Sequence, residues 1–165
     1  MQKALICCIW GYTLMYSDVI TLFNRFETAE GIIWYPTILR GVDLNVDKAA
    51  VIAKYGEQTA DNALLHIKCR QEGGKIYVGD KLYLPPKLWA LQERESLSET
   101  LTFASGTKFD FFVLGEWDDT QTVDDNAEEW LEGFYNYINK RYDYVFSISS
   151  TALYSVIPHF EIAAK

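Results

Sequence analysis

Histidine and cysteine are scarce in this sequence, and their scarcity limits the chemistry that the protein can perform. The 165 residues include two histidines, His66 and His159, and three cysteines. Two histidines far apart in the chain give little from which to build a metal centre or a general base. An odd set of cysteines, with Cys7 and Cys8 adjacent, matches neither a disulfide framework nor a zinc site. We therefore expect a reducing compartment and buried thiols that act as small apolar side chains.

Basic residues are also in deficit. The chain has 15 Lys and Arg against 23 Asp and Glu, which gives a formal net charge of −8. A surface that grips nucleic acid needs clustered Lys and Arg, and docking onto an anionic membrane needs them as well. The composition argues against both functions. An acidic protein can still lie beside DNA without holding it, because like charges repel.

The sequence has no long apolar run, internal repeat or linker. Residues 1–14 carry Lys3 and then an apolar run to Trp10, which is shorter than the ~20 residues that cross a bilayer and is followed by no small-residue cleavage site. We interpret residues 1–14 as an N-terminal arm or extension, with translation from Met15 as an alternative. Residues 15–165 are expected to form a single β-rich domain, since their length suits one core.

Recognisable catalytic and cofactor-binding motifs are missing. The sequence contains no nucleotide-binding glycine loop, no GxSxG, no HExxH and no Cys–His nucleophile arrangement. Asp43, Asn45 and Asp47 have the spacing that opens a calcium loop, but Lys48 stands where the loop needs glycine and Lys54 where it needs glutamate. We predict no catalytic residue, no cofactor, no bound metal and a protein that is not an enzyme.

The second histidine raises one further possibility. His159 and Glu161 lie two residues apart, so on a strand they share a face and could bind a metal or titrate together. A single pair lacks the three or four ligands that zinc requires, so we expect a structural tail. His66 falls on the polar face of a predicted strand, where a solvated or cross-strand partner is expected.

Aromatic and apolar residues are abundant. They make up 15% and 49% of the chain, which excludes a mainly disordered protein and leaves aromatic surface to spare for self-association. Strand-like patterns fill most of the chain. They cover Val19–Phe26, Ile32–Leu39, Val42–Asp47, Ala63–Cys69, Ile76–Val78, Leu82–Leu84, Thr100–Phe103, Phe109–Gly115, Tyr144–Ser149 and Val156–Ile162. Pro36 cannot donate to a ladder and predicts an edge strand or bulge, while Gly79 and Asp80 predict a two-residue hairpin turn.

One long helix is predicted near residues 126–141. Apolar side chains recur there at three- and four-residue spacing, with Asp125 as N-cap and Glu128 as the partner in a capping box. Its buried face is expected to contain Trp130, Phe134 and Ile138. The patterns together predict a β-dominated α+β fold, an antiparallel barrel-like sheet with one long amphipathic helix packed on it.

Two polar segments are candidates for an interface. An acidic run contains Asp118, Asp119, Asp124, Asp125, Glu128, Glu129 and Glu132. Paired carboxylates can serve a glycosidase, but negative charge is favoured where a helix begins, so we expect a solvated helix start. The alternative is that the run faces a pore or binds a cation. A polar hairpin tip with Gly56, Glu57, Asp61 and Asn62 is the second candidate.

The order of several segments resembles a known family. DVITLFNRF, WYPTILRGVDLNV, GDKLYLPPKLW, KFDFFVLGEW and VIPHFEI follow one another as in an uncharacterised family of phages and prophages of Gram-positive bacteria, typically encoded among minor capsid and head–tail genes. The resemblance covers about residues 15–162 and supplies no catalytic residues. The sequence departs from the family at residues 1–14 and at Ala163 and Ala164, where glycines are expected.

The resemblance implies a structural role in the virion. Head–tail adaptors and stoppers look like small β-barrels that form a homo-oligomeric ring around the DNA channel. The implied partners are further copies of the chain and the neighbouring neck, portal or tail proteins, with DNA passing through without specific binding. The protein would be made in the bacterial host cytoplasm and end in the virion, with no membrane partner.

A second function stays open. A monomeric binding module, for carbohydrate for example, could use exposed Trp34, Trp89 or Trp117 as stacking platforms. The solution mass and the exposure of these three side chains distinguish the two hypotheses.

Overall fold

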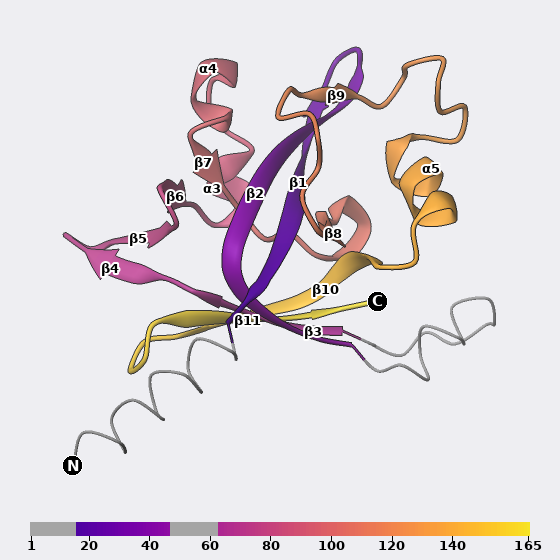
Figure 1. Cartoon of the computed structure of the whole chain (residues 1–165). Helices are drawn as coiled ribbons and strands as arrows, with labels where there is room; N and C mark the ends of the chain where they lie inside the picture. The colour runs from indigo at the N-terminus through magenta and orange to yellow at the C-terminus, as the bar shows by residue number, and fades with distance from the viewer. Residues whose placement is uncertain (1–15, 47–62) are drawn as a thin grey trace.

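The computed structural model describes residues 16–46 and 63–165, and β-strands dominate this part of the chain (Figure 1). Six strands close into an antiparallel barrel in the order β1-β8-β10-β11-β3-β2, and β2 pairs back with β1. Their bounds are β1 Asp18–Thr28, β2 Gly31–Val46, β3 Ala63–Lys68, β8 Phe111–Leu114, β10 Val145–Tyr154 and β11 His159–Ala164. The predicted barrel-like antiparallel sheet is confirmed.

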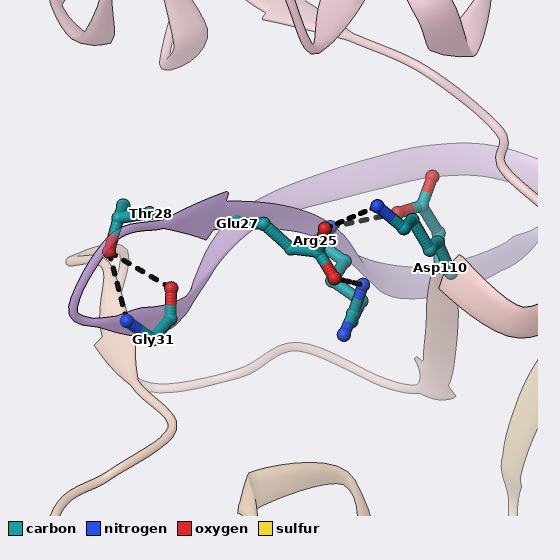
Figure 2. A network of polar contacts seen from close by, with 6 residues as sticks. Arg25, Glu27, Thr28, Gly31 and Asp110 are labelled. Carbon is teal, nitrogen blue, oxygen red and sulfur yellow. Dashed lines mark hydrogen bonds and ion pairs between the residues drawn. The ribbon is translucent and has the colours of Figure 1, made fainter.

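The longest ladder joins β1 to β2 and turns tightly between Thr28 and Gly31. The Thr28 hydroxyl accepts the Gly31 N–H at 3.2 Å and donates to the Gly31 carbonyl at 2.9 Å (Figure 2). Gly31 has φ of +145°, and a Cβ there would lie 2.0 Å from Nδ2 of Asn126. Glycine suits this turn because L side chains rarely adopt such a φ and because a Cβ would displace the side chain of Asn126.

Pro36 lies inside β2, opposite Phe23 of β1. Among the described strands, the other side of β2 pairs with β9 (Val123–Asp124) at Ile33 and Trp34 and with β3 only from Asp43 onward. Pro36 therefore occupies a stretch whose outer side has no ladder partner, as the missing N–H of proline demands.

Alternate strand residues fill the barrel. Ile20, Leu22, Phe112, Phe146 and Phe160 are at most 1% exposed and belong to one interior cluster. The alternation predicted for residues 63–69 is confirmed, because Ala63, Leu65 and Ile67 of β3 are buried in the same cluster.

A smaller four-stranded sheet adjoins the barrel in the order β4-β5-β6-β7. Its strands are β4 Arg70–Glu72, β5 Lys75–Val78, β6 Lys81–Tyr83 and β7 Thr100–Leu101. The turn at Gly79 and Asp80 is confirmed, since Val78 pairs with Lys81 and Gly79 has φ of +58°. The short helices α3 (Pro86–Trp89) and α4 (Arg94–Leu97) and the 3-10 turn η1 (Gly106–Lys108) accompany this sheet.

The predicted long helix over 126–141 is wrong in its first half. Helix α5 runs from Phe134 to Arg141, and residues 126–133 form turns. Gly133 has φ of +90° and ψ of 154°, which breaks helical geometry just before Phe134. Asp125 does cap the helix, but across this turn: its Oδ1 accepts the Phe134 N–H at 2.9 Å. The apolar spacing that is typical of a helix extends back through residues 126–133, but the conformation of Gly133 separates these residues from the helix.

Helix α5 covers the outer face of the barrel wall formed by β1, β8 and β10. Phe134 and Ile138 are fully buried in a second apolar cluster with Phe23 and Phe111, as predicted for the helix face. Trp130 is only half-buried at the margin of this cluster, because it precedes the helix, and its Nε1 donates to the Asp124 carbonyl at 2.8 Å.

Candidate functional site

The acidic run divides into two parts with different roles. Asp118 and Asp119 are exposed in the loop after β8 and line a hollow of about 310 Å³ together with Trp117 and Tyr142. The two aromatic rings are 6.3 Å apart between centroids and nearly perpendicular. Carboxylates beside aromatic rings form a surface that suits a polyol or a cation. The hollow therefore keeps Asp118 and Asp119 as candidate binding residues.

Asp124 and Asp125 instead hold the fold together. Oδ1 of Asp125 accepts the Trp34 indole N–H at 2.7 Å and the first N–H of α5 at 2.9 Å. Asp124 belongs to β9, and its Oδ1 accepts the Asn126 N–H at 2.9 Å. The expected solvated helix start does not describe Asp125, because its carboxylate is the acceptor that the buried indole of Trp34 needs.

The other candidate segment, with Gly56, Glu57, Asp61 and Asn62, lies outside the described residues. The calcium-like spacing falls on β2, which contains Asp43 and Asn45 and ends at Val46. The strand interpretation of those residues is confirmed, and Asp47 also lies outside the described residues.

Two of the three tryptophans proposed as stacking platforms are buried. Trp34 is 3% exposed and Trp89 is 1% exposed, so neither can stack against a ligand at the surface. Trp34 packs edge-on against Phe111, 4.9 Å between centroids, and Trp89 packs against Tyr35 at 6.0 Å. Partners distant in sequence cover both indoles. Trp117 is the one of the three that is half-buried, and it borders the hollow described above.

A row of polar side chains crosses three strands of the barrel. Asp43 of β2, His66 of β3 and Glu161 of β11 lie directly opposite one another in register. His66 Nδ1 is 3.3 Å from Asp43 Oδ2, and His66 Nε2 is 3.5 Å from Glu161 Oε2. The possible pairing of His159 with Glu161 is not formed, because the imidazole opposite Glu161 is that of His66. The ring of His159 instead stacks on Tyr154, 4.8 Å between centroids.

The polar row connects three strands through contacts between one imidazole and two carboxylates. Within residues 16–46 and 63–165, no group of three or more His, Cys, Asp or Glu side chains has the arrangement that could hold a metal ion. We therefore assign the row to cross-strand pairing.

The turn between β10 and β11 presents apolar side chains to solvent. Val156 is 96% exposed and Ile157 is 73% exposed, and Leu153 and Tyr154 at the end of β10 are 40% and 47% exposed. We call residues 153–157 the apolar tip. Sequence reasoning placed a turn and a tail here but missed the tip, because exposure at a hairpin end depends on how far the strands extend beyond the barrel.

A buried carboxyl lies behind the strand β1. Asp110 is fully buried, and its oxygens accept the Ala104 N–H at 2.7 Å, the Asn24 amide at 2.9 Å and the Arg25 N–H at 2.8 Å; Figure 2 labels Asp110 and Arg25. Burial raises the pKa of Asp110 to about 7, although these donors favour the ionised form and oppose the shift. The carboxyl joins β1 to the segment after β7.

The Arg25 side chain extends from β1 into a cleft that Glu27 and Lys108 also line. Arg25 Nη1 is 2.6 Å from Oε1 of Glu27, and Lys108 of η1 bonds to the other oxygen of the same carboxylate. These two cations lower the pKa of Glu27. Sequence reasoning missed this cluster, because Lys108 reaches Glu27 only through the fold.

One known protein family matches nearly the whole chain. The profile of a family of unknown function, DUF6751, matches residues 15–165. The chain belongs to this family. The match spans the whole barrel, the smaller sheet and α5, so all surfaces described above lie in the part shared with the family.

No curated protein and no solved structure matches the chain. None of the helices in the described segments is long and apolar enough to cross a membrane.

Proposed function

We propose that this protein is a structural component of a phage virion, built into the head–tail junction as a homo-oligomeric ring around the DNA channel. The resemblance of five ordered segments to a family encoded among head–tail genes motivates the proposal. Membership of a family of unknown function is compatible with it, and a small closed antiparallel barrel is the architecture that such a role implies. The protein would be made in the host cytoplasm and would act as a contact surface and not as an enzyme.

The apolar tip is the observation that supports assembly best. Four apolar side chains of residues 153–157 are at least 40% exposed, on a hairpin that projects from the barrel (Figure 1). Exposed apolar groups of this kind mark contact sites when they gather in one place. In a ring, the apolar tip of each copy would pack against the next copy and would be shielded from water.

The charge distribution supports a channel role for a different part of the surface. The chain between β8 and β9, which contains the exposed Asp118 and Asp119, lies apart from the hairpin of β10 and β11 that carries the apolar tip (Figure 1). The hairpin can therefore contact neighbouring copies, or the portal and tail proteins, while the acidic loop faces the lumen. Carboxylates there would let DNA pass without adhesion.

Complementation of a gene deletion tests the proposal. Deletion should leave filled heads and free tails, or heads that leak DNA, and the wild-type gene should restore infectious particles. The double variant Val156→Ser with Ile157→Ser should fold but fail to restore them, because the apolar contact is removed.

A matched control is Leu131→Ser, which removes a side chain that is 95% exposed but lies away from the tip. This variant should complement fully. Infectious particles from the deletion strain, or purified virions without the protein, would refute the structural role.

One observation favours a second candidate, a carbohydrate-binding module at the hollow of Trp117, Tyr142, Asp118 and Asp119. A glycan array with the purified protein tests it. Binding that Trp117→Ala abolishes and Leu131→Ser preserves would favour this function over the ring.

A further inference from the structure

A cleft of about 730 Å³ opens between β1, helix α3 and the segment that leads into η1. The apolar side chains accessible in the cleft include Phe26, Pro86 and Leu91, whereas the lining residues Trp89 and Phe103 are only 1% and 3% exposed. The volume falls in the range of ~300–1,000 Å³ that small-molecule sites occupy. The cleft is separate from the apolar tip and from the hollow at Trp117, since it shares no lining residue with either.

The charge of this cleft is opposite to that of the protein as a whole. Three cationic side chains, Arg25, Lys87 and Lys108, line it beside a single acidic one, Glu27. The carboxylate of Glu27 bridges two of the cations, with one oxygen on Arg25 and the other on Lys108 (Figure 2 shows the Arg25 contact). The Arg25 side chain is 16% exposed, and the backbone at this residue is bound to Asp110 through its N–H.

Two buried polar atoms of the lining residues are unpaired. Nε1 of Trp89 and Oγ1 of Thr102 have no hydrogen-bond partner in the described part of the chain, and each residue is 1% exposed. An indole N–H is a donor only, and burying it without an acceptor is costly. The residues around the cleft thus include a buried indole N–H whose donor is unused in the described part of the chain.

We propose that this cleft binds a small amphipathic carboxylate. Its carboxylate takes the place of Glu27 between Arg25 and Lys108, while its aliphatic or aromatic body lies against Phe26, Pro86 and Leu91. The cation pair already holds one carboxylate, so its geometry suits this group. Glu27 acts as an internal competitor that keeps the pair occupied until a ligand displaces it. The apolar wall adds affinity by removing the body of the ligand from water.

Binding of octanoate to the full chain tests the proposal. Affinity is measured by titration calorimetry, and the site is located by the shift of the Trp89 indole N–H resonance, which Trp89→Phe assigns. Octanoate should bind and shift this resonance, whereas octanol and octylamine, which lack the carboxylate, should bind at least about tenfold more weakly.

Variants that each neutralise one charged side chain give a sharper prediction. Glu27→Gln should bind octanoate about tenfold more tightly, because the internal competitor is gone, and Lys108→Gln should bind it about tenfold more weakly. Glu72→Gln and Lys140→Gln are matched controls, since both residues form exposed ion pairs elsewhere, and they should leave the affinity unchanged. Equal binding of octanol, unchanged affinity in Glu27→Gln, or shifts confined to residues 153–157 would overturn the proposal.

Discussion

The buried carboxyl of Asp110 should make the protein less stable as the pH rises toward neutrality. Burial raises its pKa from the ordinary value of 3.8 to about 7. Between these two values the folded chain keeps a proton at Asp110 that the unfolded chain has released. The contribution of Asp110 to the free energy of unfolding is therefore fully present below pH 3.8 and is lost as the pH rises through 7. The loss amounts to about 4 kcal/mol, at about 1.4 kcal/mol for each unit of pKa.

Comparison with Asp110→Asn isolates this effect. The variant keeps the size of the side chain but does not titrate, so the other ionisable groups cancel when the two proteins are compared. Urea unfolding should be followed by circular dichroism at several values between about pH 4 and about pH 8. The free energy of unfolding of the wild type, minus that of the variant, should fall by about 4 kcal/mol across this range.

The opposing interactions define the result that would refute this reasoning. Three donors, from Asn24, Arg25 and Ala104, point at the carboxyl and favour its ionised form. If they outweigh burial, the difference between the two proteins stays constant within about 0.5 kcal/mol, or rises with pH. Either outcome would mean that Asp110 is ionised in the folded protein throughout this range.

Three further substitutions test the packing, each by urea unfolding. Asp125→Ala should lower the free energy of unfolding by about 2–4 kcal/mol, because the buried indole of Trp34 and the first N–H of α5 lose their common acceptor. The exposed control Asp118→Ala should change it by less than about 0.5 kcal/mol. Gly133→Ala should cost about 1–3 kcal/mol, because φ is +90° and the new Cβ would lie 3.1 Å from a carboxylate oxygen. Phe112→Ala should cost about 3–5 kcal/mol by emptying the barrel interior.

The strands were predictable from sequence because their signal is local. Alternation in residues 63–69 gives the buried face of β3, and Gly79 marks the hairpin turn by its conformational freedom alone. The start of α5 was not predictable in the same way. Asp125 followed by Glu128 matched a capping box, yet the acceptor that Asp125 offers is used by Trp34 and by the N–H after Gly133. A tertiary contact replaced a local one.

The residues of the candidate site were likewise predictable only where the signal in the sequence is local. Asp118 and Asp119 lie where a polar loop was expected, because an acidic run with few apolar neighbours is solvated whatever the fold. The cleft could not be found from sequence. Arg25 and Glu27 lie two residues apart on one face of a strand, like many surface pairs. Lys108 contacts Glu27 from a position 81 residues further along the chain. Trp34 and Trp89 were expected to be exposed but are buried, because the residues that cover them are also distant in sequence.

The net charge of −8 overstates the acidic surface that could face DNA. Several carboxylates serve other groups: Glu27 holds two cations, Glu116 pairs with Arg40, and Glu132 pairs with Lys140. Asp110 and Asp125 are withdrawn into hydrogen bonds that maintain the fold.

Two exposed carboxylates outside these pairs are adjacent in the loop after β8. Asp118 and Asp119 are exposed and take part in none of the ion pairs among the described residues. If repulsion keeps DNA from adhering to a ring of this protein, this loop can supply part of it, whereas a paired carboxylate contributes little field beyond a Debye length of about 8 Å. Cationic substitutions at these two positions would then hinder DNA passage, whereas the same change at Glu116 or Glu132 would mainly break a surface ion pair. The charge that matters for the proposed role is therefore that of the unpaired surface carboxylates and not the net charge of the whole chain.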